Sequence, residues 1–305
     1  MEYADCFCNE TYSSLSESPD IYAYLRRAER FIMKTVVGID VGGSTTKIVG
    51  FDAEGRLIAP IFVRATDQIT SIYGALGKFT TENGLALTDI ERIMVTGVGS
   101  TFMVEPIYNI PVYKLSEFSC VGRGGIWLSG LSEAIVVSMG TGTALVHAKA
   151  DGTFDYLGGT GIGGGTLMGL SEKLIGMKDI DHIIELAAEG DLSKIDLRVS
   201  DITKKDVHPG LAANLTAANF GKISDIATKS DLALGLVNMI YETIGMMAIF
   251  AARGKGIRDI VLTGNLTALP QAREIFGNLN AFFDVNFIIP ENARFGTVIG
   301  AALQN

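Results

Sequence analysis

The sequence predicts an α/β protein built from two similar lobes with a ligand-binding cleft between them. The prediction rests on a hairpin pattern that occurs twice. Residues 36–40 are apolar and largely β-branched, a glycine pair makes a tight turn, and residues 46–51 are mostly apolar again. The same pattern returns at residues 134–137 and 144–148, on either side of a second glycine turn. Because alternating helix and strand patterns follow the hairpins, we expect each hairpin to open its own lobe.

Other elements follow from local patterns. We expect, in chain order, a helix at 69–82, a strand at 92–96, a strand at 259–263 and a C-terminal helix at 296–303. The lobes are predicted to occupy residues 34–120 and 121–305. Residues 1–33 differ in composition from the rest, and we expect an N-terminal extension with one short amphipathic helix at 21–32.

The most apolar long stretch, residues 232–252, has the length of a membrane span. It contains Asn238, Glu242 and Gly245 and has no basic flank on its N-terminal side, which disfavours a spanning helix. We therefore expect a buried or interface helix and no membrane partner.

Composition narrows the function classes. The 305 residues are 48% hydrophobic, enough for two moderate cores, and the formal net charge of -9 disfavours a nucleic-acid partner. Cys6, Cys8 and Cys120 form neither a disulfide framework nor a zinc-binding spacing. The first residues are polar and acidic, unlike a secretory signal. We expect a cytoplasmic protein.

The first glycine turn carries groups that bind phosphate. Its residues are Asp40, Gly42, Gly43, Ser44, Thr45 and Lys47. The glycines allow close backbone approach, the hydroxyls donate hydrogen bonds, and the lysine adds a positive charge. Asp40 at the strand end is a candidate to hold Mg²⁺ through a water molecule. An ordinary hairpin turn is the alternative interpretation of this loop by itself.

A second turn of the same kind makes phosphate binding the better interpretation, because two facing loops can hold both ends of a triphosphate. Its residues are Gly140, Thr141, Gly142 and Thr143. A third cluster, which includes Gly163, Gly164 and Gly165, leads into an apolar run, and we expect its backbone N–H groups to meet phosphate at a helix start.

Two other nucleotide-binding motifs are disfavoured. No stretch satisfies the P-loop pattern GxxxxGK[ST]. Gly161 and Gly163 suggest a dinucleotide-binding turn with Asp181 downstream, but Thr166 stands at the third glycine position. ATP held by paired hairpins remains the leading expectation.

Together these loops resemble those of the type II pantothenate kinases, within the superfamily of actin, hexokinase and heat-shock chaperone ATPases. The resemblance covers residues 34–305. Its most specific segments are 38–43 with Lys47, 139–143, 161–165, 215–221 and 291–293 ahead of Gly300-Ala301. It implies duplicated actin-like, ribonuclease H-like lobes with an interlobe nucleotide cleft, and a homodimer.

The resemblance also implies an activity, namely Mg²⁺- and ATP-dependent phosphorylation of pantothenate or a pantetheine-like alcohol, the first step of coenzyme A biosynthesis. In the family, a glutamate followed by phenylalanine is the general base, and Glu117-Phe118 matches that pair. Gly264 and Asn265 join the ATP-binding set. The implied substrate contacts are Tyr156, Gly159, Thr160 and Thr216.

Tyr156 departs from the family pattern, because an arginine that contacts the pantothenate carboxylate commonly stands there. A tyrosine can donate one hydrogen bond but carries no positive charge to pair with a carboxylate. The sequence therefore leaves open whether the acceptor is an acid. Arg123 and Lys114, near Glu117 in the sequence, are candidate replacements for the missing charge.

Two alternative functions share the expected fold. One is a sugar kinase of the N-acetylglucosamine type. The other is an ATP-driven activator of acyl-CoA dehydratases, which requires interface cysteines for an iron–sulfur cluster. Cys6 and Cys8 fall in the extension and Cys120 stands alone, which disfavours the activator.

Overall fold

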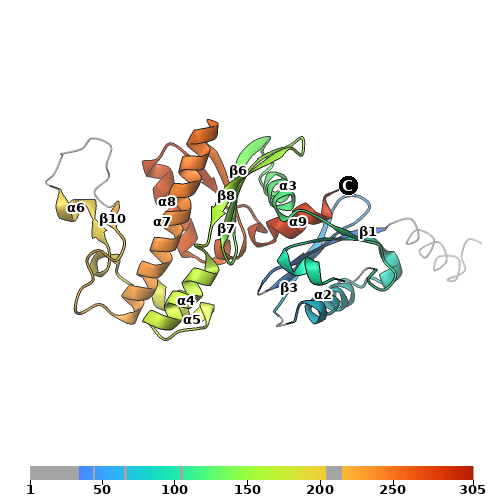
Figure 1. The fold of residues 1–305 in the computed structure, drawn as a ribbon, viewed down its shortest axis with the longest axis horizontal. Helices are drawn as coiled ribbons and strands as arrows, with labels where there is room; N and C mark the ends of the chain where they lie inside the picture. The colour runs from blue at the N-terminus through green and yellow to red at the C-terminus, as the bar shows by residue number, and fades with distance from the viewer. Residues whose placement is uncertain (1–33, 44, 65–66, 104–105, 204–214, 305) are drawn as a thin grey trace, which may run out of the picture.

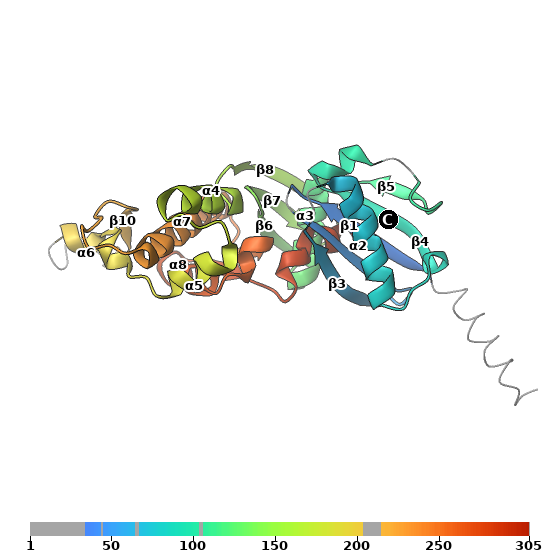
Figure 2. The same ribbon diagram turned by 90° about the horizontal axis from the view of Figure 1, so that it is seen from below.

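A computed structural model of the chain describes residues 34–43, 45–64, 67–103, 106–203 and 215–304. Two α/β lobes lie side by side along the long axis of the molecule (Figure 1). The view from below shows the same division (Figure 2). The predicted extension at 1–33, with its helix at 21–32, lies outside the described residues.

Each lobe contains one five-stranded sheet, and the two sheets have the same topology. The first sheet has the order β3-β2-β1-β4-β5 and the second β12-β11-β6-β7-β8. In each sheet three successive strands pair antiparallel, and the two later strands add in parallel. The predicted fold of two similar lobes is therefore confirmed.

The strand bounds are as follows. The first lobe has β1 (Thr35–Val41), β2 (Thr46–Phe51), β3 (Leu57–Val63), β4 (Ile90–Thr96) and β5 (Val112–Lys114). The second has β6 (Glu133–Met139), β7 (Thr143–Lys149), β8 (Phe154–Thr160), β11 (Asp259–Thr263) and β12 (Asn286–Ile288). A separate two-stranded sheet pairs β9 (Leu197–Arg198) with β10 (Thr216–Ala218). The strands predicted at 46–51 and 259–263 have these same bounds, and the others agree within two residues at each end.

The helices are α2 (Gln68–Glu82), α3 (Glu117–Ser129), α4 (Gly164–Leu174), α5 (Ile180–Ala188), α6 (Val199–Ile202), α7 (Lys229–Lys255), α8 (Gln271–Phe282) and α9 (Gly296–Ala302). Short 3-10 turns are η1 (Leu87–Asp89), η2 (Val98–Phe102), η3 (Leu192–Lys194), η4 (Asn265–Ala268) and η5 (Ala293–Phe295). The predicted helices at 69–82 and 296–303 correspond to α2 and α9.

The first sheet is covered on both faces, and its strand sequences show why. Every residue of β2 is buried, which fits a sheet without a solvent face. Helix α2 buries Ile72, Ala75, Leu76 and Phe79, a stripe at helical spacing, in the core of this lobe. Helix α9, from the C-terminal end of the chain, packs against β1, β2 and β4 of the first lobe.

The second lobe forms around α7, which contacts α4, α5 and α8 as well as the sheet. Among the described residues α7 is the one helix with the length and composition of a membrane span. Most of that apolar window is buried inside the lobe, so the helix belongs to the core. The prediction of a buried helix at 232–252 is thus confirmed.

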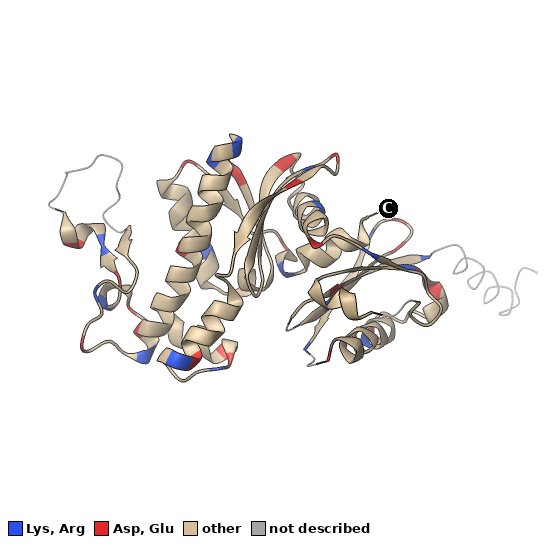
Figure 3. Ribbon diagram, viewed as in Figure 1, with Lys and Arg blue, Asp and Glu red and all other residues tan. Residues whose placement is uncertain are grey.

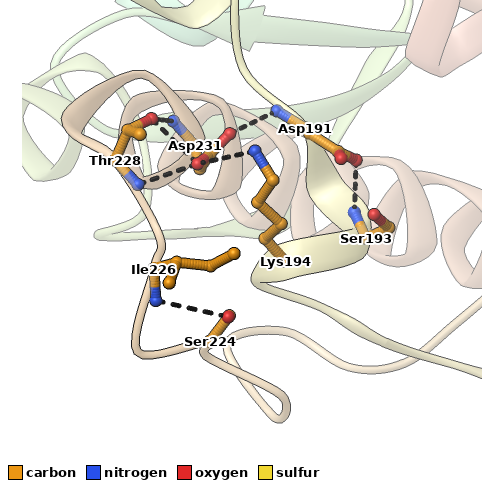
Figure 4. Close-up of polar contacts among 7 residues, drawn as sticks. All are labelled: Asp191, Ser193, Lys194, Ser224, Ile226, Thr228 and Asp231. Carbon is orange, nitrogen blue, oxygen red and sulfur yellow. Dashed lines mark hydrogen bonds and ion pairs between the residues drawn. The ribbon is translucent and has the colours of Figure 1, made fainter.

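A cluster of polar side chains and backbone groups stabilises the first turn of α7 (Figure 4). Thr228 and Asp231 form a capping box, in which the Thr228 N–H and hydroxyl both donate to Asp231 Oδ2 at 2.8 Å. The Asp191 N–H donates to Asp231 Oδ1 at 2.8 Å, and Lys194 Nζ lies 3.4 Å from Oδ2. These hydrogen bonds lower the pKa of Asp231 to about 2, so the cap carries its charge at neutral pH.

The lobes meet where α3 crosses α9. Helix α3 follows the last strand of the first sheet and leads into the first strand of the second. Glycines line the crossing, because a Cβ on Gly124 would collide with the carbonyl of Gly296, and one on Gly300 with the carbonyl of Cys120. This close contact places the N-terminal end of α3, and therefore Glu117, between the two lobes.

Candidate active site

A cleft of about 470 Å³ lies between the lobes and is lined from both sheets. The first lobe and the start of α3 contribute Asp40, Gly42, Gly43, Thr45, Lys47, Gly97, Val98 and Glu117. The second lobe and α9 contribute Ser138, Gly140, Thr141, Gly142, Thr143, Ala144, Tyr156, Gly159, Thr160, Gly161, Gly264, Asn265 and Thr297. The structure therefore brings together most of the site residues expected from the sequence.

The two hairpins that open the lobes face this cleft with equivalent positions but different chemistry. Asp40 pairs directly with Lys47 across β1 and β2. At the corresponding place in the second lobe, Ser138 pairs with Ala144 across β6 and β7. All four residues line the cleft. The first lobe therefore presents a carboxyl group and an amino group to the cleft, whereas the second presents a hydroxyl and a methyl group.

Both turns are closed by their own backbone. The Gly42 N–H donates to the Thr45 carbonyl at 3.0 Å, and the Gly140 N–H donates to the Gly142 carbonyl at 2.9 Å. A Cβ on Gly142 would lie 3.0 Å from the carbonyl oxygen of Thr160 on β8, so the second turn lies tightly against its neighbour. Compact turns of this kind bring backbone close to a ligand.

Three titratable groups influence one another in the cleft. Burial raises the pKa of Asp40, and the charge of Lys47 opposes that shift. Burial also lowers the pKa of Lys47, against the attraction of Asp40 and Glu117. The pKa of Glu117 is raised, first by burial and then by the negative charge of Asp40, while Lys47 lowers it. A carboxylate with a raised pKa that lines a cleft beside a glycine turn is a candidate general base.

Glu117 is the first residue of α3, where Ser116 is the N-cap. Among the hydrogen bonds of the described residues, none engages its carboxylate, which lines the cleft and is available to a ligand. The next residue, Phe118, stacks on Tyr156 of β8 with ring centroids 3.9 Å apart and an interplanar angle of 17°. This stack joins the helix that carries Glu117 to the strand that carries Gly159 and Thr160.

The third glycine cluster has a supporting role in the structure. The Gly164 N–H donates to the Gly140 carbonyl at 2.8 Å, and the Gly165 N–H donates to the Thr141 carbonyl at 2.9 Å. A Cβ on Gly163 would lie 2.6 Å from the Thr141 carbonyl. The N–H groups of Gly164 and Gly165 are therefore occupied by the second turn, and residues 163–165 are not among the residues that line the cleft. Residues 163–165 therefore support the second glycine turn from the side away from the cleft, and their contact with phosphate stays a prediction.

One further expected residue, Thr216, lies away from the cleft. Thr216 is on β10, outside the lining, and its hydroxyl donates to Glu242 of α7 at 2.8 Å. Asn219 donates to the other oxygen of Glu242 at 2.9 Å, so this segment is tied to α7. The contact of Thr216 with substrate stays a prediction. Ser44 lies outside the described residues.

The lining also includes residues that were not among the site residues predicted from the sequence. They are Gly97, Val98, Ser138, Ala144, Gly161 and Thr297. Gly97 directly follows β4 with φ of 86°, and a Cβ there would lie 2.6 Å from Asp40 Oδ1. Gly264 takes the equivalent place after β11 with φ of 93°. A glycine directly after a parallel strand was the signal that could have identified Gly97, because ligands bind where such strands end.

The cleft suits a magnesium ion that keeps most of its water. Within the described ranges, no group of three or more His, Cys, Asp or Glu side chains is arranged to hold a metal. Mg²⁺ in nucleotide sites usually takes one or two carboxylates, several waters and phosphate oxygens. Asp40, which lines the same cleft as both glycine turns, is the candidate for such a carboxylate.

Cys120 does not have the properties of a cluster ligand. It is fully buried where α3 crosses α9. Burial raises the pKa of its thiol to about 11, which disfavours the thiolate that metal binding requires. Cys6 and Cys8 lie outside the described residues.

Solved structures share this two-lobed architecture. The activator of the 2-hydroxyisocaproyl-CoA dehydratase from Clostridium difficile with bound ADPNP aligns with a TM-score of 0.64 and 17% identity, over 88% of this chain and 93% of that one. A ROK family glucokinase from Streptomyces griseus in complex with glucose and AMPPNP aligns with a TM-score of 0.54 and 12% identity, over 88% and 98% of the chains. At such identities the similarity shows the fold alone.

Proteins related in sequence identify the family, whereas the solved structures show only the fold. A family model described as Fumble matches residues 131–275. The type II pantothenate kinase of Staphylococcus haemolyticus is 31% identical over 280 residues, which cover 88% of this chain and 99% of the relative. The enzyme of the same name from Staphylococcus aureus is 32% identical over 239 residues, or 75% and 84% of the two chains. With this near-complete coverage, the chain belongs to the type II pantothenate kinase family.

Proposed function

We propose that this protein phosphorylates pantothenate, or a closely related pantetheine-like alcohol, with ATP as the phosphoryl donor. The reaction would be the first step of coenzyme A biosynthesis. The observation that carries the proposal is the position of Glu117 in the same cleft as two facing glycine turns. Its carboxylate has a raised pKa and makes no hydrogen bond to another described residue. The names of the relatives support the same activity.

In this proposal the glycine turns hold the triphosphate. Backbone and hydroxyl groups of Thr45 and Thr141 donate to phosphate oxygens, and Lys47 supplies a point positive charge. The Thr143 hydroxyl donates to the Ile162 carbonyl at 2.8 Å and supports the turn. Gly264 and Asn265 complete the nucleotide side of the cleft. A magnesium ion, held by Asp40 through water, would neutralise charge on the phosphates.

Glu117 acts on the acceptor. Its carboxylate accepts the proton of the substrate hydroxyl while that oxygen forms a bond to the γ-phosphorus, and the bond from phosphorus to the bridging oxygen of ADP breaks. Because Lys47 stabilises the ionised form of Glu117, the phosphate loop and the base are electrostatically linked. Tyr156, Gly159 and Thr160 of β8 form the acceptor side.

The protein is further proposed to be a cytoplasmic homodimer that pairs through α7. Phe250 is an apolar residue of this helix that is 62% exposed. Met239, Thr243 and Met246 precede it at helical spacing and are only partly buried. An apolar stripe of this kind suits burial against a second copy better than contact with water.

Release of ADP in a coupled assay tests the activity. The purified protein is supplied with MgATP and, separately, pantothenate, pantetheine or N-acetylglucosamine. We expect ADP release that depends on pantothenate or pantetheine, a phosphorylated product detectable by mass spectrometry, and loss of turnover when EDTA removes magnesium. Turnover with the amino sugar alone would identify a sugar kinase, and ADP release that is independent of every acceptor would favour an ATPase.

A further inference from the structure

Arg294 belongs to the second lobe, but its side chain lies on the first. Its turn, η5, is anchored beside the cleft, because Gly264, which lines the cleft, donates its N–H to the Ala293 carbonyl at 3.0 Å. The Arg294 guanidinium lies over the ring of Phe62 on β3, and its central carbon is 4.9 Å from the ring centroid. A cation above an aromatic face is attracted to the ring. One cation–π contact therefore links a turn of the second lobe to an edge strand of the first.

The ring beneath Arg294 stands next to a residue of the cleft. Phe62 is directly opposed to Lys47 across β2 and β3, and Lys47 is directly opposed to Asp40 across β1 and β2. Opposed residues of neighbouring strands project from the same face of a sheet. Asp40, Lys47 and Phe62 therefore form one row across the first sheet. The row begins in the cleft, which Asp40 and Lys47 line, and ends at the ring that Arg294 covers.

The charge of Arg294 acts on Lys47. Burial is the main cause of the lowered pKa of Lys47, and the positive charge of Arg294 lowers it further. The negative charges of Asp40 and Glu117 oppose that shift. Within the described ranges, no hydrogen bond or ion pair engages the Arg294 side chain, and its Nε is buried without an acceptor. No described carboxylate therefore neutralises the guanidinium, and its charge is felt at the lysine.

A second interaction between the lobes involves the same strand. Arg64 directly follows β3, two positions after Phe62. The backbone N–H of Asp181 is the main cause of the lowered pKa of Asp179, the N-cap of α5 in the second lobe, and the charge of Arg64 adds to that shift. The end of β3 is thus close to the second lobe at two separate points.

A cation–π contact alone can be ordinary packing, and the second lobe contains an example. Arg253 of α7 lies 5.6 Å from the ring centroid of Phe283, which follows α8. Neither residue is among the described residues that line the cleft. Lys and Arg are scattered among Asp and Glu over both lobes (Figure 3), so a basic surface does not account for the position of Arg294. What distinguishes Arg294 is its place between the lobes and beside Lys47.

We propose that Arg294 is a positioning residue for ATP, whose contact with Phe62 holds the Lys47 end of the first glycine turn towards the second lobe. The inference rests on the proposed function only in that the cleft binds ATP. Without the contact, the β2–β3 edge loses a link to the second lobe. Lys47 is then less often at the place where it can meet a phosphate that the second glycine turn holds. The loss appears as weaker ATP binding, limited by the strength of one cation–π contact.

Calorimetric titration with a non-hydrolysable ATP analogue and Mg²⁺ tests the inference without an acceptor. Arg294→Met and Phe62→Leu should each weaken binding by about three- to thirtyfold, the range expected for one cation–π contact. Arg294→Lys keeps a cation above the ring and should stay within about threefold of the wild type. The double variant Arg294→Met/Phe62→Leu should bind no more weakly than the weaker single variant, because both changes remove the same contact. In steady-state assays KM for ATP should rise by the same factor, while KM for the acceptor stays within about twofold.

Phe283→Leu is the matched control, because it removes a ring beneath an arginine within one lobe, and its ATP affinity should equal that of the wild type. Thermal unfolding establishes that each variant is folded. Wild-type affinity in folded Arg294→Met or Phe62→Leu, additive losses in the double variant, or an equal loss in Phe283→Leu would each overturn the inference. If the wild type binds the analogue but phosphorylates no acceptor, the proposed function fails, and the affinities still decide the inference.

Discussion

Asp40 and Lys47 are directly opposed across the β1–β2 ladder. A carboxyl group and an amino group therefore lie next to each other where the first glycine turn begins. Directly opposed residues in an antiparallel pair have Cβ atoms about 5 Å apart, close enough for a strong interaction in a partly buried site. The equivalent pair of the second lobe, Ser138 and Ala144, carries no charge. The duplicated hairpins have thus diverged so that one lobe bears the charges of the cleft.

Substitution of Glu117 tests its proposed role as the general base. Glu117→Gln retains the shape of the side chain but cannot accept a proton, so we expect phosphorylation to fall by a factor of about 10² to 10⁴. ATP affinity should be retained, because in the proposed mechanism the glycine turns, and not Glu117, hold the phosphates. Single-turnover kinetics together with ATP titration would separate these effects. Turnover close to that of the wild type would remove Glu117 from the mechanism.

The dependence of activity on pH follows from the raised pKa of Glu117. Because the base must be ionised, activity should fall as pH drops through a pKa higher than that of an ordinary glutamate, whose reference value is 4.5. Lys47 lowers this pKa, so Lys47→Met should move the acid limb of kcat/KM to higher pH as well as reduce the plateau.

Arg123→Met is the matched control for that experiment, because it removes a positive charge beside Gly152 rather than one in the cleft. Its acid limb should coincide with that of the wild type. An acid limb that stays in place in the Lys47 variant would show that the ionisation observed is not that of Glu117.

Crowding of the second turn should weaken nucleotide binding. In Gly142→Val the branched side chain would press on the Thr160 carbonyl, which already lies 3.0 Å from the position of a Cβ, and would occupy space beside the phosphates. We expect ATP affinity, measured by calorimetry, to fall at least tenfold while the fold persists. Gly254→Ala is the control, since nothing lies within 4 Å of its Cβ. ATP binding that is equal in both variants would argue against a phosphate contact at Gly142.

The oligomeric state tests the role of α7. We expect light scattering to give about twice the chain mass of 32.5 kDa at micromolar concentration. Phe250→Glu should shift the protein towards the monomer, because a charge would be buried in the apolar interface. Phe154→Glu, a change at an exposed aromatic residue on β8, should leave the mass unchanged. A wild-type monomer would contradict the dimer.

Local patterns in the sequence were sufficient for much of the architecture. Short apolar runs beside glycine turns predicted β2 and β11 with their observed bounds, and helical spacing predicted α2 within one residue. The glycine turns at 42–43 and 140–142 were visible for the same reason, because a turn depends on a few consecutive residues. Glu117 required more than its local pattern, since a lone glutamate after a short strand carries no distinctive signal.

The sequence by itself determined the strands, the turns and the residue types that surround a phosphate, since each depends on neighbours along the chain. Only the tertiary structure decided which of them meet. Gly164 and Gly165 have the pattern of a phosphate loop, yet their N–H groups donate to the carbonyls of the second turn. Tyr156 and Phe118, which are 38 positions apart, form one surface only because α3 lies against β8. Contacts of this kind depend on how helices and sheets pack across the chain, and the local pattern of residues does not encode them.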